Sequence, residues 1–155
     1  MTDSVELISE PVLFYVQEFY CFDNFSAFAV VWRGSLWMTA EHAYQASKFE
    51  HISPLWDIIR DEISAHQAKK TAETYKHQMR RDWLDVRLAI MEEVLRAKLA
   101  QHEYVRRKLL ETGERRIIES SPDDSFWGWG PNKDGENHLG RIWMKLRGEL
   151  REGRI

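Results

Sequence analysis

The chain has 155 residues, of which 43% are hydrophobic and 30% charged, a balance typical of one globular domain with one core. Its formal net charge of −3 excludes a general electrostatic attraction to nucleic acid or to a membrane. No apolar run approaches the ~20 residues of a membrane span, and the first residues lack the basic and apolar regions of a signal peptide. We therefore expect a cytoplasmic protein that forms a single domain over residues 1–155.

Cysteine and histidine usage disfavours thiol and metal chemistry. Cys21 is the only cysteine, which excludes an intrachain disulfide, and we interpret it as a small buried apolar residue. No two of the six histidines have the i,i+4 spacing of a helical zinc site, so we interpret His42 as a packed or supporting residue. A glycine-rich phosphate loop of the Walker or Rossmann type is also missing from the sequence, which argues against a kinase or a dehydrogenase. We expect neither a cofactor nor a metal.

The first third of the chain has β-type patterns. Residues 12–16 form a short β-rich run, and two further runs, 28–32 and 35–38, flank Arg33-Gly34, a plausible two-residue hairpin turn. Residues 22–26 place turn formers between aromatic residues, so they are predicted to form a loop.

The densest polar chemistry follows in residues 37–49, where Thr39 is predicted to cap a helix. At about 100° per residue, Glu41, Gln45 and Lys48 share one face of that helix. The commoner explanation is a solvated polar stripe with a Glu near the helix N-terminus, where the macrodipole favours it. The other explanation is a site that combines an acid, an amide and an amine.

Helical patterns dominate the middle of the chain. Ser53-Pro54 predicts an N-cap before a first-turn proline, and Ser64 with Gln67 predicts a capping box. A longer helix is predicted from about Asp82, continuing to Gly113. Its apolar stripe, which we assign to the core, consists of Leu84, Leu88, Met91, Leu95 and Leu99.

Residues 69–116 are locally basic, with 13 Lys and Arg against 8 Asp and Glu. Such a region suits a small phosphorylated ligand, although a solvated helix surface is the commoner explanation. Trp83, beside Arg80 and Arg81, is predicted to lie off the apolar stripe and to face outwards into a pocket. Seven tryptophans in the chain suit a core, but also a pocket that stacks on a base-like ring.

The last third is predicted to form a strand, a loop and a helix. Residues 115–119 resemble a strand, and Asp124 and Trp127 lie in a following loop that is too rich in Trp and acid for a simple connector. Asn137 is predicted to cap a final amphipathic helix. The predicted class is α+β: a single mostly helical domain with a small β-sheet formed by the N-terminal hairpin region and a later strand.

Four sequence blocks resemble the YbiA-like or NADAR family of N-glycosidases. The family motifs T-S-E-H-x-x-Q-x-x-K-F, F-x-N-F, D-x-x-W-G and G-x-N-x-L-G are similar to residues 39–49, 22–25, 124–128 and 135–140. These blocks occur in family order, so the resemblance covers a domain core of about residues 13–150. Two positions depart from the pattern: Ala40 replaces the usual Ser, which would remove a hydroxyl, and His138 replaces the usual Arg, which would weaken a phosphate contact.

The resemblance implies roles for individual residues. It matches Glu41, Trp83 and Asp124 to the acid, the aromatic residue and the second acid of a glycosidase site, and Lys48 to a lysine that contacts or attacks the ribose. The residues expected to bind substrate are Asn24, Gln45, Trp83, Trp127 and Asn137. For the two asparagines a role as turn former or cap remains open, and for Trp127 a role in the core.

Cleavage of an N-glycosidic bond passes through an oxocarbenium-like state, which needs a carboxylate near the sugar and a way to stabilise the leaving base. Glu41 and Asp124 would supply two carboxylates. Alternatively, the Lys48 amine would attack the anomeric carbon and form a Schiff base with the opened sugar. Both routes are compatible with the sequence.

Two functions are consistent with these residues. The first is an N-glycosidase, for which the resemblance implies a small phosphorylated ribosyl or ADP-ribosyl substrate. The substrate would be a ribosylaminopyrimidine phosphate intermediate of the riboflavin pathway, or ADP-ribosyl-guanine, either free or in ADP-ribosylated DNA. The second is a non-catalytic module that binds ADP-ribose or a nucleotide, which would not need Glu41, Lys48 and Asp124 together.

Overall fold

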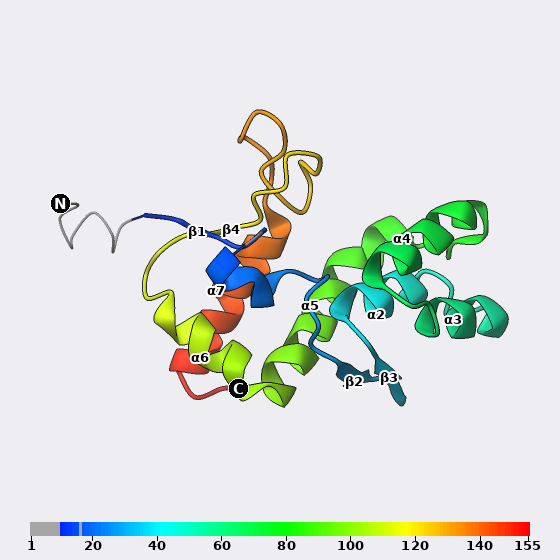
Figure 1. Cartoon of the computed structure of the whole chain (residues 1–155), viewed down its shortest axis with the longest axis horizontal. Helices are drawn as coiled ribbons and strands as arrows, with labels where there is room; N and C mark the ends of the chain where they lie inside the picture. The colour runs from blue at the N-terminus through cyan, green and yellow to red at the C-terminus, as the bar shows by residue number, and fades with distance from the viewer. Residues whose placement is uncertain (1–9, 16) are drawn as a thin grey trace. The chain divides into compact units, whose positions relative to one another are not determined.

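The computed structural model describes residues 10–15 and 17–155 (Figure 1). The chain divides into two compact units: one comprises Asn24–Gln101, and the other joins the segment up to Asp23 to His102–Ile155. Helices dominate and all strands are short, which confirms the α+β class. Among the described residues, none of the helices combines the length and the apolar composition that crossing a lipid bilayer requires.

The unit Asn24–Gln101 begins with the predicted hairpin. Strands β2 (Val30–Trp32) and β3 (Ser35–Trp37) pair antiparallel. The turn residues have φ angles of 48° at Arg33 and 76° at Gly34. Two consecutive left-handed residues are what a type I′ hairpin turn requires, so the prediction from Arg33-Gly34 is confirmed.

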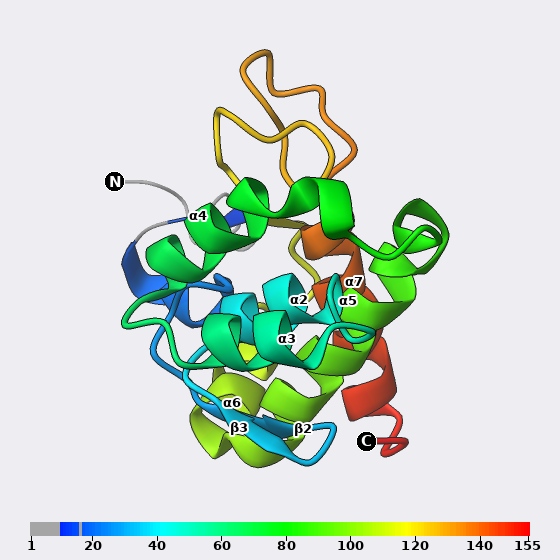
Figure 2. The ribbon, with the colours of Figure 1, turned by 90° about the vertical axis from the view of Figure 1, so that its right-hand side faces the viewer.

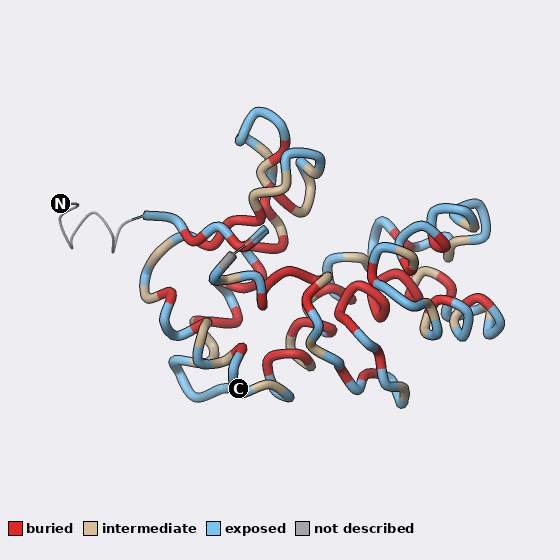
Figure 3. The backbone as a smooth tube through the Cα atoms, viewed as in Figure 1, coloured by how far each residue is buried: buried red, intermediate tan, exposed pale blue. Residues whose placement is uncertain are grey.

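Helix α2 (Ala40–Ser47) is central to this unit, and all of its residues are buried (Figure 3). It packs against three further helices: α3 (Ser53–Arg60), α4 (Ala65–Thr74) and α5 (Trp83–Gln101). Figures 1 and 2 both show α2, α3 and α4 side by side. The fully buried Ala40, Ala43 and Ala46 allow this close packing because a methyl group occupies little space.

The predicted helix caps are confirmed at Thr39 and Ser64 and shifted at α3. The Thr39 hydroxyl accepts a hydrogen bond from the His42 amide, and the Ser64 hydroxyl accepts one from Gln67. Helix α3 instead begins one residue early, with Ile52 at the N-cap and no side-chain cap. Proline fits the first turn because its missing N–H would have no helical partner there, so the helix does not have to begin at Pro54.

The long predicted helix is two helices, and its stripe is only partly buried. Helix α5 ends at Gln101, and α6 (Glu103–Glu111) begins after His102. Burial of Met91, Leu95 and Leu99 is confirmed, whereas Leu84 and Leu88 are 72% and 39% exposed. The apolar spacing defines a face, but burial also requires a neighbouring element along that face. In the first two turns of α5, burial is limited to Trp83.

The other unit contains a separate two-stranded sheet. Strand β4 (Ile117–Ile118) pairs parallel with β1 (Val12–Leu13) and does not join the hairpin. The prediction of one sheet containing the hairpin and the later strand is therefore corrected to two sheets. Strand register and partner depend on contacts across the fold that a local apolar pattern does not contain.

The core of this unit is built around α7 (His138–Arg151) and the short 3-10 helix η1 (Gln17–Phe22). The Trp143 indole donates a hydrogen bond to the Phe22 carbonyl over 3.0 Å, and the two rings lie 5.1 Å apart. Cys21 is buried, as predicted. Gly113, with a φ of 59°, ends α6 at the predicted position because a left-handed residue closes a helix.

Candidate functional site

The polar residues of α2 are buried within the fold. Glu41 and Gln45 are 6% and 5% exposed, and the Gln45 amide nitrogen donates a 2.7 Å hydrogen bond to the Glu41 carboxylate. The Glu41 backbone N–H donates to the Asn24 carbonyl over 3.1 Å, which joins the predicted loop to the first turn of α2. A solvated polar stripe is therefore excluded, and the α2 polar face (Glu41, Gln45 and Lys48) is a structured acid–amide–amine row.

Two amide oxygens beside Glu41 lack a protein donor. Asn24 is 6% exposed, and its amide nitrogen contacts the Met91 sulfur at 3.3 Å. Within the described part of the chain, Asn24 Oδ1 and Gln45 Oε1 accept no hydrogen bond. Buried acceptors without a donor are uncommon and destabilise a fold, so each requires an explanation.

Lys48 follows the last residue of α2, and its amine lies beside a pair of neighbouring aromatic rings. Its ammonium nitrogen lies 5.6 Å from the ring centre of Tyr44 and 5.5 Å from that of Trp83. The two rings are 5.2 Å apart. Trp83 is buried and does not face outwards as the sequence predicted. Its ring instead forms part of the environment of Lys48. For Tyr44, the other ring, the i,i+4 spacing from Lys48 in the sequence indicates that the two side chains are neighbours.

This environment changes the acidity of the amine. Burial lowers the pKa of Lys48 below its ordinary value, Glu41 and Glu73 act in the opposite direction, and Lys69 lowers it further. Desolvation is the largest of these effects. A lysine that acts as a nucleophile must lose its proton, and a lowered pKa makes the neutral form more accessible.

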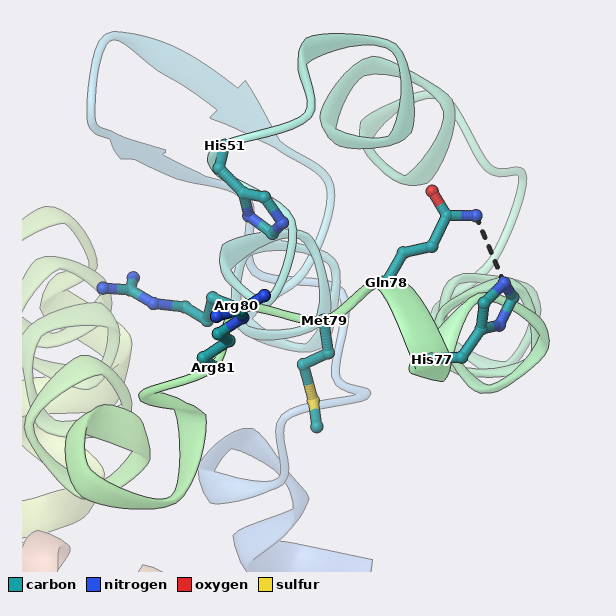
Figure 4. Close-up of a pocket in the computed structure, with 6 residues that line it drawn as sticks. All are labelled: His51, His77, Gln78, Met79, Arg80 and Arg81. Carbon is teal, nitrogen blue, oxygen red and sulfur yellow. Dashed lines mark hydrogen bonds between the residues drawn. The ribbon is translucent and has the colours of Figure 1, made fainter.

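A basic hollow lies next to the end of α2 (Figure 4). It is lined by His51, His77, Gln78, Met79, Arg80 and Arg81. The Arg80 backbone N–H donates to the Lys48 carbonyl over 2.8 Å, so this segment is attached directly to the catalytic candidate. Arg80 forms a two-bond ion pair with Asp82, whereas Arg81 is exposed and pairs with no acid among the described residues.

His42 has a structural role. It is fully buried; its Nδ1 lies 2.8 Å from the Thr39 hydroxyl and its Nε2 lies 3.0 Å from the Glu62 carbonyl. A carbonyl only accepts, so Nε2 carries the proton and Nδ1 accepts from Thr39. The prediction of a packed, supporting histidine is confirmed.

Asp124 lies in the Trp-rich loop of the other unit. One of its carboxylate oxygens accepts hydrogen bonds from the backbone N–H groups of Phe126 and Trp127, over 3.0 and 2.8 Å. These bonds close the turn that contains the D-x-x-W-G motif. Trp127 is half-buried, with its ring edge-on to Phe126 at 4.9 Å. The predicted role of Asp124 as the second acid, and that of Trp127 as a wall of the pocket for the base, remain predictions.

Asn137 uses both ends of its amide within the protein. Its oxygen accepts from the Glu119 N–H and its nitrogen donates to the Ile117 carbonyl, each over 2.9 Å. Asn137 precedes α7, as predicted, but its side chain fastens β4 and does not cap the helix. A Cβ at Gly140 would overlap the Ile117 carbonyl and the Asn137 amide, so only glycine fits there.

The structure thus brings together five of the predicted residues within one unit. These are Asn24, Glu41, Gln45, Lys48 and Trp83. Asp124, Trp127 and Asn137 belong to the other unit. Sequence reasoning did not assign Tyr44, Glu73 or Lys69 to the environment of Lys48. In the described residues, no cluster of three or more His, Cys, Asp or Glu has the arrangement of a metal site.

Comparison with known proteins identifies the family of the chain. Residues 13–151 match the model of the NADAR domain. The chain belongs to the NADAR family. It is 39% identical over 137 residues to the N-glycosidase Npun_R5314 of Nostoc punctiforme, covering 87% of this chain and 88% of that protein. It is 35% identical over 133 residues to the N-glycosidase YbiA of Escherichia coli K12, covering 83% of this chain and 80% of that protein.

The structural comparison supports the same family. The NMR structure of E. coli YbiA superposes with a TM-score of 0.83 at 30% identity, covering 94% of this chain and 88% of that one. A further relative, the riboflavin biosynthesis protein VVA0006 of Vibrio vulnificus, is 36% identical over 148 residues. That match covers 94% of this NADAR chain but 40% of the Vibrio protein.

The two departures from the family motif are structurally accommodated in this NADAR protein. Ala40 is fully buried at the start of α2, among the alanines that pack the helix. His138 lies with its Nε2 3.2 Å from the Glu136 carboxylate and its ring 4.5 Å from that of Phe126. Neither residue carries a group that belongs to the α2 polar face.

Proposed function

We propose that this N-glycosidase hydrolyses a phosphorylated ribosylamine of a pyrimidine, with Lys48 as nucleophile and Glu41 as its acid–base partner. The observation that carries the proposal is the Lys48 amine, which lies within 5.6 Å of the centres of two aromatic rings, has a lowered pKa and shares a helix face with a buried carboxylate. A ligand-binding module has no need for a partly buried amine with a lowered pKa beside a buried carboxylate. The name of the Vibrio relative favours a riboflavin precursor over ADP-ribosyl-guanine.

The reaction begins with a proton transfer from Lys48 to Glu41, which leaves a neutral amine. The amine attacks the anomeric carbon, the bond from that carbon to the base nitrogen breaks, and its electron pair leaves with the base. Glu41 returns the proton to the leaving nitrogen as general acid. The Lys48 nitrogen, which is positively charged after its attack, then gives a proton to the ring oxygen as the bond from that oxygen to the anomeric carbon breaks, and the opened sugar is held as a protonated imine. Water adds to the imine carbon and the carbon–nitrogen bond breaks, which releases the sugar as an aldehyde and returns the Lys48 amine.

The phosphate of this substrate is assigned to the basic hollow. Its lining includes two arginines and two histidines and contains no acid. Figure 4 shows His51 near the two arginines and His77 at the opposite side of the view. Arg81, which has no acidic partner in the described chain, is the natural first contact for a phosphate because a guanidinium binds two phosphate oxygens at once. The hollow adjoins Lys48 through the Arg80 amide.

Trapping of the covalent intermediate tests the assignment of Lys48. Borohydride added during turnover reduces an imine, so a peptide map should show the sugar on Lys48 alone. Lys48→Arg keeps the positive charge but cannot form an imine, so it should bind product while losing turnover by roughly 10⁴-fold. Lys69→Arg, an exposed lysine near Lys48, is the matched control and should retain turnover.

The opposite result has a defined meaning. If no adduct forms and Lys48→Arg keeps most of its rate, then Lys48 only positions the sugar or its phosphate. Hydrolysis would then proceed through water activated by a carboxylate.

A comparison of substrates tests the choice of leaving base. Purified protein is incubated separately with the ribosylaminopyrimidine phosphate and with ADP-ribosyl-guanine, and the free base is measured by chromatography. We expect release from the pyrimidine. Release only from ADP-ribosyl-guanine would overturn the substrate, and tight ADP-ribose binding without any release would favour the non-catalytic module.

A further inference from the structure

Two buried amide oxygens have unused hydrogen-bonding capacity, and each belongs to a residue that is hydrogen-bonded to Glu41. Asn24 Oδ1 and Gln45 Oε1 are enclosed by protein, yet no described residue donates to them. A buried acceptor without a donor destabilises a fold unless a ligand or water supplies the missing donor. Two such atoms beside one carboxylate indicate a ligand that supplies two donors.

The orientation of both amides is determined by their nitrogen ends. The Gln45 nitrogen donates to the Glu41 carboxylate, and rotating the amide would bring two oxygens together. The Asn24 nitrogen donates to the Met91 sulfur, which is a weak acceptor. This sulfur has no proton to donate, so it could not bond the amide oxygen if the Asn24 amide were rotated. Both oxygens are therefore presented as acceptors by the rest of the site.

Other amides in the protein show that this state is specific to the site. In the same unit, Gln101 accepts from the Val31 N–H and donates to the Val31 carbonyl, each over 2.8 Å. In the other unit, Asn137 is satisfied at both ends. Gln101 and Asn137 are therefore satisfied at both ends of the amide, whereas Asn24 and Gln45 each leave the amide oxygen unused.

We propose that Asn24 Oδ1 and Gln45 Oε1 accept hydrogen bonds from the 2′- and 3′-hydroxyls of the sugar, so that the enzyme selects ribosyl over 2′-deoxyribosyl substrates. The inference rests on the proposed function, which places the anomeric carbon at Glu41 and Lys48. Of the sugar's own donors, the 2′- and 3′-hydroxyls lie closest to that carbon when the 5′-oxygen carries the phosphate. The nitrogen of the leaving base, by contrast, takes up a proton, which the acid Glu41 supplies and an amide oxygen cannot.

This assignment has a catalytic consequence. Hydrogen bonds to the 2-hydroxyl strengthen as the oxocarbenium character develops, so they lower the barrier as well as bind the sugar. A deoxy substrate would leave a buried acceptor unpaired in the complex. A site that hydrogen-bonds a substrate hydroxyl rejects an analogue without that hydroxyl strongly. An apolar pocket rejects an analogue that differs by one methylene group far more weakly.

The test compares kcat/KM for the ribosyl substrate and its 2′-deoxy analogue. The wild type should prefer the ribosyl substrate by roughly 100-fold or more. Asn24→Leu removes one acceptor and should reduce that preference by at least roughly 10-fold, mainly through slower cleavage of the ribosyl substrate. Its melting temperature should stay constant or rise, because an unpaired buried acceptor has been removed. Equal losses on both substrates, with a lower melting temperature, would overturn the inference.

Gln45→Met is the second variant, since Asn24→Leu has to fit a tight site. It also releases Glu41, so both rates should fall, but the ratio of the two rates should again move towards one. Gln101→Met is the matched control because its amide is fully bonded to Val31. That control should lower the melting temperature and leave the ribosyl preference unchanged. An unchanged ratio in Gln45→Met would overturn the role of Gln45.

A binding experiment separates this inference from the proposed reaction. Calorimetry with ribose 5-phosphate and 2-deoxyribose 5-phosphate should give at least roughly 10-fold tighter binding of the ribose compound, and Asn24→Leu should remove the difference. If that difference persists in a protein that cleaves no substrate, the proposed function fails and the inference stands. If the protein cleaves both sugars equally, or discriminates only by amino groups of the base, the reaction stands and the inference fails.

Discussion

The two asparagines of the family motifs, Asn24 and Asn137, have opposite hydrogen-bonding states. Both are buried to the same extent, at 6% exposure. Asn137 bonds two backbone groups around β4, whereas Asn24 makes one weak contact to sulfur and presents an unpaired oxygen. A motif match alone therefore does not separate a residue that binds a ligand from one that holds the fold. The distinction lies in which atoms still lack a partner.

The acids of the two units differ in the same way. Glu41 lies on a rigid helix, with its carboxylate bonded to a neighbouring side chain in an acid–amide–amine row. Asp124 lies in a loop, and one carboxylate oxygen holds two backbone N–H groups. Substitutions in each unit can therefore be designed to separate chemistry from folding.

Among substitutions of these two acids and of the two motif asparagines, the largest effect is expected for Glu41→Gln. The amide can still accept from Gln45 but can neither take nor return a proton, so turnover should fall by roughly 10³-fold at an almost unchanged melting temperature. Steady-state kinetics and thermal denaturation measure both quantities. Glu73→Gln, which removes the exposed acid near Lys48, is the control and should keep most of its rate. Full activity in Glu41→Gln would remove Glu41 from the mechanism.

Asp124→Asn should come next. The substituted amide oxygen can still accept from Phe126 and Trp127, so the turn should persist with a loss of less than about 1 kcal/mol. If Asp124 is the predicted second acid, turnover should nevertheless fall by roughly 100-fold. A melting temperature lowered by several degrees at full activity would instead show that Asp124 only closes the loop.

Asn137→Ala should affect stability. It leaves the Glu119 N–H and the Ile117 carbonyl unpaired, so we expect the free energy of unfolding in urea to fall by about 3 kcal/mol. Asn24→Ala, the matched change at the other motif asparagine, should lose far less because it removes an acceptor that has no protein donor. A raised KM without loss of stability in Asn137→Ala would show that Asn137 binds substrate, as the resemblance implies.

Arg81→Gln should have a moderate effect that depends on the phosphate. It should raise KM roughly 10-fold for the phosphorylated substrate, with little change for the same substrate without phosphate. Isothermal titration with inorganic phosphate provides an independent reading of the same contact. Equal changes for both substrates would assign the phosphate to another part of the protein.

The smallest effect concerns pH. If neutral Lys48 is the nucleophile, the rate should rise with pH until it passes the pKa of Lys48, which burial keeps below the ordinary 10.5. Glu73 raises this pKa and Lys69 lowers it. The rising limb should therefore shift to lower pH in Glu73→Gln and to higher pH in Lys69→Gln. Limbs that coincide in all three proteins would show that another group controls the rate.

Sequence reasoning predicted those parts of the fold that depend on local chemistry. The hairpin turn follows from Arg33-Gly34, the start of α2 from the Thr39 hydroxyl, and the end of α6 from Gly113. It failed where burial depends on distant neighbours. Leu84 fits the apolar stripe but remains exposed, because no periodic pattern states how far a neighbouring element extends.

The face of α2 that Glu41, Gln45 and Lys48 share was predictable from residue spacing, but its burial and hydrogen bonding were not. The spacing of Glu41, Gln45 and Lys48 indicates a shared helix face, which the structure contains. That the face is buried could be inferred only from the three small alanines on the same helix, a weak pattern. The unpaired oxygens and the lowered pKa of Lys48 arise from atoms brought together by folding, so no linear pattern encodes them.

Gly140 shows how differently these positions should behave during evolution. Any side chain there would overlap the carbonyl of Ile117, whatever substrate the enzyme cleaves. The position should therefore stay glycine in descendants with altered specificity, as should the asparagine that it accommodates. Under the proposed sugar contacts, Asn24 and Gln45 have a different constraint, because their amides would bind the sugar hydroxyls. In a lineage that changes its sugar, those two positions should diverge first while Gly140 remains fixed.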